Sequence, residues 1–405
     1  MTLLQAPKAV LAERLARLGT ETAFSVSAEA AAHAAKGHKV YPFHLGDMNL
    51  ATPPNIVEAT IRAMRDGMTR YAPPAGIGQL REALAADLNK THGTTYTGSN
   101  VAIQPGGKPV IGKFFLALMN PGDEVLYPNP GYPIYESQIE FHGGVAVPYG
   151  FVQGKDNFEI DFAGMEKKIT PRTRFLVFNN LQNPTGAESS HEELARLAEL
   201  VVRHDLKVLC DEAYFDIRYS GESESLVSFP GVAERAVILY TFSKKFAMTG
   251  WRLGAAVGPA DWIAAIARLN VNDESCSNTF IQYGALEALQ GDQSGAQGLL
   301  DVLRERRDKA LAILAGTPGV SCFAANTTFY LFPDVTEAMA NLGLDDYDRF
   351  RLAALEATGV SFCTRLHFGR ALPGESRRFI RFAYSGIDAD QIEEGLEGFR
   401  SFLAR

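Results

Sequence analysis

The sequence is poor in cysteine and has no excess of positive charge. Its four cysteines, in 405 residues, form no Cys-x-x-Cys pair and no metal-ligand spacing with histidine. We therefore expect no disulfide framework and no metal site, and we interpret the cysteines as buried apolar residues in a reducing compartment. Lysine and arginine total 39 against 47 aspartates and glutamates, a formal net charge of -8. Such a chain lacks the basic face that a nucleic-acid partner requires.

Long apolar runs and targeting patterns are also missing. No run of about 18 apolar residues occurs, so we expect no membrane-spanning segment. The first 20 residues contain Glu13 among the basic residues and no small-residue cleavage site. This predicts a cytoplasmic protein without a secretory or organellar address. With 46% apolar and 21% charged residues, the composition is that of an ordinary globular protein.

The stretch TFSKKFAMTGWRLG, residues 241–254, carries the strongest chemical signal in the chain. An apolar run, AVILY, leads into a turn with two adjacent lysines, and Arg252 follows the first lysine by eight residues. A lysine in an apolar pocket loses its proton through desolvation, and the neutral amine condenses with aldehydes. An arginine one loop away offers fixed donors to a phosphate, so the pair suits a phosphorylated aldehyde.

This stretch resembles the signature S-x-K-x-F-x-M-T-G-W-R-x-G of the class I/II aminotransferases, fold type I enzymes that use pyridoxal 5'-phosphate (PLP). The resemblance implies that Lys244, selected over Lys245 by its spacing to Arg252, forms the Schiff base with PLP, and that Lys245 lies outside the pocket. Thr241 and Ser243 would offer hydroxyls to the cofactor phosphate, together with the arginine. Further family motifs follow in family order from about residue 39 to about residue 390.

Two strand ends match the family residues that hold the cofactor ring. KVLCDEAY resembles D-E-x-Y, which implies that Asp211 faces the pyridine nitrogen and that Tyr214 bonds the phenolate oxygen. Glu212 alternates to the other side of the strand, where we expect a structural role. FNNLQNPTG resembles N-N-P-x-N-P-T-G, with Leu181 in place of the first proline. Asn183 would then contact both the phenolate oxygen and the substrate carboxylate.

Two glycine- and tyrosine-containing segments match the rest of the cofactor site. VAIQPGGK reads as a strand, a glycine turn and a helix start, whose free N–H groups bind phosphate well. The resemblance implies phosphate contacts from Gly106, Gly107 and Lys108, with a solvated side chain as the alternative for the lysine. GYPIY matches the family's P-x-Y/W-P-x-Y, which places Tyr132 flat on the pyridine ring. We expect Tyr135 to pack in the core.

The remaining motifs imply substrate and subunit contacts. Arg381 in FIRFAYS matches the arginine that clamps the substrate α-carboxylate. Gly46 in LGDMNLATP matches a glycine whose backbone approaches the substrate; a plain turn glycine is the alternative. Tyr71 in TRYAPPAGIG matches the tyrosine that reaches the cofactor phosphate of the neighbouring subunit, which implies a homodimer. If Asp273 or Glu274 lined the pocket, a cationic substrate would be favoured. The alternative for that pair is a solvated acidic loop.

Hydrophobic periodicity adds a coarse secondary structure. It predicts helices over residues 8–18, 80–88, 193–202, 297–314, 346–357 and 387–403. It predicts strands over residues 39–45, 236–240, 320–325, 328–335, 360–365 and 379–385, and further strands at the start of VAIQPGG, DEVLYPN and FLVFNN and in KVLCDEAY. The resemblance implies the PLP-dependent transferase fold type I, an α/β fold. A large domain, residues 49–295, would hold a mostly parallel seven-stranded sheet. Residues 296–405 and the N-terminal segment 1–48 would form a smaller α+β domain.

The same resemblance implies an aminotransferase with Lys244, Asp211 and Tyr214 as catalytic residues. It would move an amino group between an L-amino acid and a 2-oxo acid by a ping-pong mechanism through a Lys244 aldimine. A PLP-dependent lyase, of the C–S β-lyase type, is the alternative, because it shares the cofactor residues. A DNA-binding regulator on the same fold is disfavoured, because the roughly 40 residues before Gly46 leave no room for a fused domain.

Overall fold

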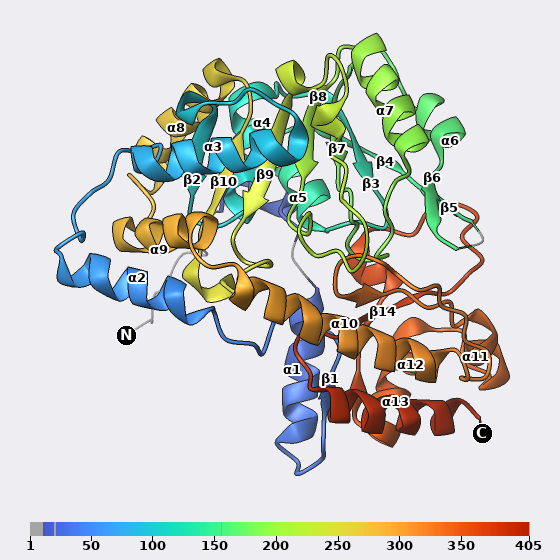
Figure 1. The fold of residues 1–405 in the computed structure, drawn as a ribbon. Coiled ribbons are helices and arrows are strands. Elements are labelled where there is room, and N and C mark those ends of the chain that lie inside the picture. Colours follow the sequence, from blue (N-terminus) through green and yellow to red (C-terminus); the bar gives the residue numbers. More distant parts are fainter. Residues whose placement is uncertain (1–10, 20–21, 155, 405) are drawn as a thin grey trace, which may run out of the picture.

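A seven-stranded sheet organises the larger part of the chain (Figure 1), which a computed structural model describes over residues 11–19, 22–154 and 156–404. The strand order is β2-β10-β9-β8-β7-β3-β4, and all strands run parallel except β10, which is antiparallel to both neighbours. The strands are β2 (Val101–Gln104), β3 (Glu124–Pro128), β4 (Val145–Tyr149), β7 (Thr173–Phe178), β8 (Lys207–Asp211), β9 (Ala236–Thr241) and β10 (Gly254–Val257). The mostly parallel seven-stranded sheet implied by the resemblance is thereby confirmed.

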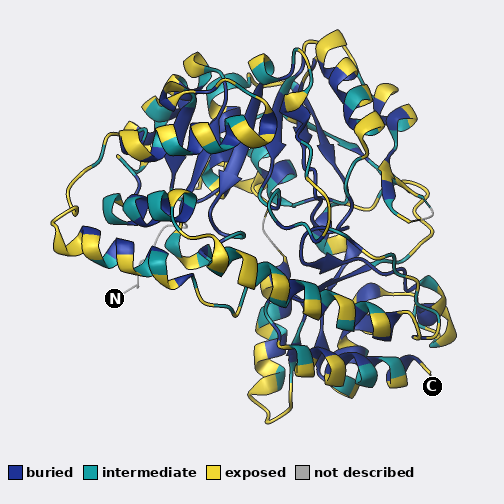
Figure 2. Cartoon of the chain, in the orientation of Figure 1, coloured by how far each residue is buried: buried dark blue, intermediate teal, exposed yellow. Residues whose placement is uncertain are grey.

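Helices cover both faces of this sheet. One face packs against α3 (Gly78–His92), α7 (His191–Arg203) and α9 (Thr279–Gln290). The other packs against α4 (Lys108–Leu118), α5 (Ile134–Phe141) and α8 (Ala260–Asp273). Because side chains alternate along a strand, Val208 and Cys210 of β8 enter the first core and Leu209 enters the second. Covering on both faces explains why strands such as β9 are apolar and buried throughout (Figure 2).

A second part of the chain, drawn below the sheet in Figure 1, joins residues from both ends of the sequence in one core. Tyr41 and Phe43, near the N-terminus, pack in that core with Phe382 and Phe399. Its strands form a parallel pair, β1-β12, and an antiparallel sheet, β11-β14-β13. The domain boundaries at residues 48 and 295 stay a prediction.

The remaining elements complete the chain. The other strands are β1 (Tyr41–Pro42), β5 (Phe151–Gln153), β6 (Phe158–Ile160), β11 (Tyr330–Leu331), β12 (Val360–Ser361), β13 (Cys363–Thr364) and β14 (Ile380–Ala383). The other α-helices are α1 (Ala23–Ala34), α2 (Pro54–Arg65), α6 (Phe162–Glu166), α10 (Ser294–Leu314), α11 (Thr336–Asn341), α12 (Tyr347–Thr358) and α13 (Ala389–Leu403). Short 3-10 helices are η1 (Glu13–Arg17), η2 (Gly98–Asn100), η3 (Leu226–Ser228), η4 (Ala233–Arg235), η5 (Thr249–Trp251) and η6 (Arg365–Phe368). No helix in the described ranges has the length and apolar character needed to cross a membrane.

Five predicted elements differ from the structure. The strands predicted over 39–45 and 328–335 are shorter, and only β1 and β11 form there. Residues 320–325 form no strand, because a single bridge between Ser321 and Asp334 is their only ladder contact and Phe323 packs against Phe158 instead. Residues 360–365 form two short strands, because β12 pairs with β1 while β13 turns to pair with β14. Of the helix predicted over 8–18, residues 8–10 lie outside the described part, and the rest forms only η1, which buries no side chain.

Candidate active site

A cavity of about 460 Å³ opens where β7, β8 and β9 end and α4 begins. Carboxyl ends of parallel strands meet at one edge of a sheet, so polar residues that follow these strands converge there. The predicted site residues that line the cavity are Gly46, Gly107, Lys108, Tyr132, Asn183, Asp211, Tyr214, Thr241, Ser243, Lys244, Arg252 and Arg381. Gly106 and Tyr71 are the two predicted site residues outside this lining.

The two adjacent lysines point in different directions. The Lys244 ammonium lines the cavity, donates to the Gly46 carbonyl oxygen at 2.9 Å and lies 5.7 Å from the Tyr214 ring centroid. Lys245 pairs with Asp216 at 2.9 Å, away from the cavity lining. The turn after β9 therefore gives the cavity one lysine, as the spacing to the arginine predicts.

Asp211, the last residue of β8, is buried with few stabilising contacts for a carboxylate. The Tyr135 hydroxyl donates to its Oδ2 at 2.5 Å, and the Ala213 N–H donates to its Oδ1 at 3.1 Å. Burial raises the pKa of Asp211 to about 6, against these two hydrogen bonds. No lysine or arginine in the described ranges forms an ion pair with it. A bound cationic group would therefore stabilise the carboxylate.

The opposite end of the cavity suits an anion. The Thr241 hydroxyl donates to the Ser243 Oγ at 2.9 Å, and both line the cavity beside the start of α4. Arg252 adopts the left-handed conformation, with φ of 55°, and donates to the Thr249 carbonyl at 2.8 Å, with no carboxylate partner among the described residues. The backbone of Gly106 packs against the Arg252 guanidinium. A Cβ at this position would lie 2.3 Å from Nη2, so a side chain would displace the arginine. Helix N–H groups, hydroxyls and an arginine without a carboxylate partner make an anion site.

Arg381 of β14 is held rigidly and keeps one donor unused. Its guanidinium donates to Asn183 Oδ1 at 3.0 Å and to the His44 carbonyl at 2.7 Å, while its buried Nε has no hydrogen-bond partner. The rings of Tyr330 and Phe368 lie on it, with centroids 4.4 and 4.5 Å from Cζ. Such a stacked, oriented guanidinium suits a carboxylate ligand.

Two tyrosines, Tyr214 and Tyr330, line the cavity and contact each other. The hydroxyls of Tyr214 and Tyr330 lie 2.6 Å apart. Gly46 must lack a side chain, because a Cβ there would lie 2.0 Å from the Tyr330 hydroxyl oxygen. The close approach of the Gly46 backbone therefore follows from packing in this chain.

Two acidic residues considered for substrate selection do not line the cavity of their own chain. Glu274 accepts hydrogen bonds at 2.6 and 2.5 Å from the buried Lys113 ammonium, and Asp273 lies 3.7 Å from the same nitrogen. Lys113 neutralises Glu274, Asp273 is largely exposed, and neither acid lines the cavity, so a preference for cationic substrates has no support within one chain. Tyr71 is also absent from the cavity lining and is 88% exposed.

Three residues that sequence reasoning did not assign to the site shape it. Tyr135 packs in the core as expected, and it also lines the cavity and donates a hydrogen bond to Asp211. Tyr330 lies over Arg381 from β11, a short strand without a motif. Burial, together with the charge of Arg381, lowers the pKa of His44 to about 4, so a neutral imidazole stands behind that arginine.

The lining fits PLP in its charges and its shape. The anion site at Arg252 and α4 suits the phosphate, Asp211 suits a protonated ring nitrogen, and Lys244 supplies an amine for the aldehyde. Tyr132 offers an aromatic face, and the guanidinium of Arg381, which also lines the cavity, offers donors to a carboxylate.

Comparison with known proteins agrees with this chemistry. Residues 39–399 match the family model "Aminotransferase class I and II". A probable aspartate/prephenate aminotransferase of Aquifex aeolicus is 35% identical, covering 97% of this chain and 98% of its own length. Aspartate aminotransferase from Thermus thermophilus, solved with maleate, superposes with a TM-score of 0.87 at 30% identity over 97% of this chain and 100% of its own. Alanine aminotransferase from Pyrococcus furiosus gives 0.89 at 27% identity over 98% and 100%.

The chain therefore belongs to the class I and II aminotransferases. It is a PLP-dependent enzyme that transfers an amino group between an amino acid and a 2-oxo acid. The relatives support this reaction over PLP-dependent lyase chemistry.

Proposed function

We propose that this aminotransferase uses a dicarboxylic amino acid, aspartate, as an amino donor. The observation that carries the proposal is the charge of the cavity. Its cationic lining residues are Lys108, Lys244, Arg252 and Arg381, and its acidic ones are Asp47 and Asp211. The names of the relatives from Aquifex aeolicus and Thermus thermophilus point to the same amino acid.

Each cation has an anionic or electrophilic partner in this proposal. Arg252 holds the cofactor phosphate, Arg381 the substrate α-carboxylate, and Lys244 the cofactor aldehyde carbon. Lys108 then takes the second carboxylate of the substrate. Its ammonium lies 5.6 Å from the ring centroid of Tyr132, and both residues line the cavity. This assignment replaces a phosphate contact for Lys108.

The roles of the other residues follow from their contacts. Bound PLP supplies an electron sink, which makes the substrate Cα proton acidic. Asp211 keeps the ring nitrogen protonated, because a buried carboxylate gains most from a cationic partner. Tyr214, whose hydroxyl lies 2.6 Å from that of Tyr330, would offer a hydrogen bond to the phenolate oxygen of bound PLP. The Lys244 amine, which lines the cavity, would serve as the base and then the acid for the substrate Cα proton. Arg381 and Asn183 hold the α-carboxylate and so fix which Cα bond is broken.

An amino-acid titration tests the donor. The yellow holoenzyme is titrated with aspartate, alanine, lysine and arginine, and conversion to the amino form of the cofactor is followed by absorbance. We expect aspartate to convert it at the lowest concentration and a 2-oxo acid to restore it. Faster conversion by lysine or arginine would contradict the proposal.

A substitution tests the role of Lys108. In Lys108→Met we expect kcat/KM for aspartate to fall roughly 10- to 100-fold, while alanine turnover changes little, because only aspartate loses an ion pair. Lys90→Met, at an exposed lysine on α3, is the control for the loss of one charge. Equal losses for aspartate and alanine, together with weaker PLP binding, would return Lys108 to a phosphate contact.

We further propose a cytoplasmic homodimer in which Tyr71 reaches the cofactor phosphate of the partner subunit. Its ring is 88% exposed and does not line the cavity of its own chain, which supports a contact across subunits. Mixing an inactive Lys244→Ala subunit with a weakened Tyr71→Phe subunit tests this. Hybrid dimers regain one intact site, so activity should rise above either parent after mixing and refolding. No rise would show that Tyr71 acts elsewhere.

A further inference from the structure

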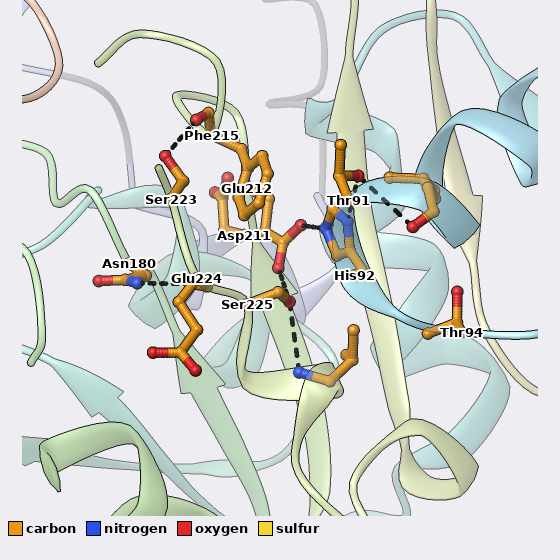
Figure 3. A network of polar contacts seen from close by, with 12 residues as sticks. Thr91, His92, Thr94, Asn180, Asp211, Glu212, Phe215, Ser223, Glu224 and Ser225 are labelled. Atoms are coloured by element: carbon orange, nitrogen blue, oxygen red, sulfur yellow. Dashed lines mark hydrogen bonds and ion pairs between the residues drawn. The ribbon is translucent and has the colours of Figure 1, made fainter. Parts of the chain in front are cut away.

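A buried ion pair lies directly behind Asp211, on the sheet face away from the cavity. Glu212 follows Asp211 and, by strand alternation, points toward α3. Figure 3 shows its carboxylate between His92 and Ser225. The His92 Nε2 lies 2.6 Å from Glu212 Oε2, and the Ser225 hydroxyl donates to Oε1. The side chains of His92 and Glu212 are 1% and 6% exposed, so water screens neither.

The hydrogen-bond pattern favours a doubly protonated imidazole. The Thr91 Oγ1 lies 3.2 and 3.4 Å from the carbonyl oxygens of Asp87 and Leu88, where its single proton is used. The same oxygen lies 2.7 Å from His92 Nδ1 and can therefore accept from that nitrogen. With Nε2 donating to Glu212, both ring nitrogens carry protons. His92 is also the last residue of α3, where the helix dipole favours a cation.

We propose that His92 is a positioning residue for Asp211: its imidazolium neutralises Glu212 through the sheet, so that Asp211 presents the single unbalanced carboxylate at the end of β8. Without that cation, two carboxylates on consecutive residues would repel each other. Glu212 also fixes the chain here, because its N–H donates to the Leu239 carbonyl of β9 at 3.1 Å. The inference rests on the proposed role of Asp211 toward the cofactor.

Other charged groups face the pair and belong to the same balance. Burial lowers the pKa of His92, but Glu212, Asp216 and Asp87 outweigh it and hold that pKa above its usual value. Lys245 pairs with Asp216 and also lies near Asp87, and Lys90 lies near Asp87 on α3. Asp216, Asp87, Lys245 and Lys90 are unchanged in the variants described below. A change in titration in those variants therefore reports on His92 and Glu212.

The charge of His92 can be read directly by NMR. In the apoenzyme labelled with ¹⁵N-histidine, the signals missing from His92→Gln identify the residue. We expect wild-type His92 to show two protonated nitrogens at pH 7.5, and to become neutral in Glu212→Gln, since a buried cation without its partner releases its proton. A neutral imidazole in the wild type would overturn the proposal.

The effect on Asp211 is measured through the pH dependence of PLP affinity in reconstituted apoenzyme. In His92→Gln, the unbalanced Glu212 should move the acid-side loss of affinity to higher pH by about one unit. Glu212→Gln and the double variant His92→Gln/Glu212→Gln should leave the pH midpoint of PLP affinity unchanged. In both variants, residues 92 and 212 carry no net charge. The opposite pattern, with Glu212→Gln lowering the midpoint and His92→Gln leaving it unmoved, would overturn the proposal.

Asp211→Asn separates this inference from the proposed function. This substitution should abolish the loss of PLP affinity at acid pH, because the carboxylate that titrates is removed. If the loss persists in Asp211→Asn, the assigned role of Asp211 fails, whatever the charge of His92. A merely structural role for His92 predicts reduced stability in His92→Gln with an unmoved midpoint, and that result would also refute the positioning role.

Discussion

Replacing Tyr135 by phenylalanine should raise the pKa of the carboxylate that faces the cofactor ring. The Tyr135 hydroxyl donates to Asp211 Oδ2 at 2.5 Å in a fully buried setting. A hydrogen bond to a charged group contributes about 1.5–3 kcal/mol. Its loss should therefore raise the pKa of Asp211 from about 6 by roughly one to two units. The carboxyl would then be largely protonated near neutral pH in the apoenzyme.

The raised pKa of Asp211 also makes the free energy of unfolding of the apoenzyme depend on pH. The pKa of Asp211 is raised from 3.8 to about 6, so between these values the folded apoenzyme keeps a proton that the unfolded chain has released. Its stability therefore falls across that window as the pH rises, by about 3 kcal/mol from this group. In Tyr135→Phe the fall should continue for roughly one to two more pH units and reach about 1.5–3 kcal/mol further.

Urea unfolding of the apoenzyme, followed by fluorescence from pH 5 to pH 8.5, measures this fall. The difference between wild type and Tyr135→Phe should grow with pH. In the Asp211→Asn background, the same tyrosine substitution should cost an amount that does not vary with pH. If the substitution costs the same at every pH in the wild-type background as well, Asp211 does not depend on Tyr135 and the reasoning is refuted.

Three further substitutions test other parts of the site. Arg381→Lys should lower kcat/KM for amino acids by roughly 30- to 1,000-fold with the PLP absorbance intact, because lysine cannot form a two-pronged carboxylate pair; loss of the absorbance would instead give Arg381 a cofactor role. Gly46→Ala should lower the unfolding free energy by about 1–3 kcal/mol and weaken PLP binding, since its Cβ would meet the Tyr330 hydroxyl; unchanged values in urea unfolding and PLP titration would make Gly46 a plain turn glycine. Glu274→Gln should destabilise the fold by roughly 1–3 kcal/mol through the buried Lys113, with the ranking of amino-acid substrates unaltered; a changed ranking would place Glu274 at the substrate.

The sheet and the catalytic stretch could be predicted because their signals are local. Apolar runs such as 236–240 end in polar residues, and this pattern gives both the strand and the edge where the site lies. The choice of Lys244 over Lys245 rests on the resemblance to the family signature, in which the lysine precedes the arginine by eight residues. An apolar run alone does not decide a strand: residues 320–325 carry one, but their Phe323 packs against Phe158 and only Ser321 makes a ladder contact.

The contacts missed from the sequence join residues that only the tertiary fold brings together. Tyr135 and Asp211 lie on α5 and β8, and no local pattern shows that the hydroxyl reaches the carboxylate. Glu274 is likewise balanced by Lys113 of α4, a partner far away in the sequence. Buried polar pairs of this kind must be satisfied, but the sequence does not show which residues satisfy them.

The attachment point of the cofactor is the most direct test of the account. Reduction of the holoenzyme with borohydride converts the linkage between the cofactor and its lysine into a stable amine, which survives proteolysis. Peptide mapping by mass spectrometry then locates the modified residue. We predict that Lys244 carries the cofactor and that Lys245, paired with Asp216, remains unmodified. Modification of Lys245, or of a lysine outside residues 241–254, would contradict the assignment of the site.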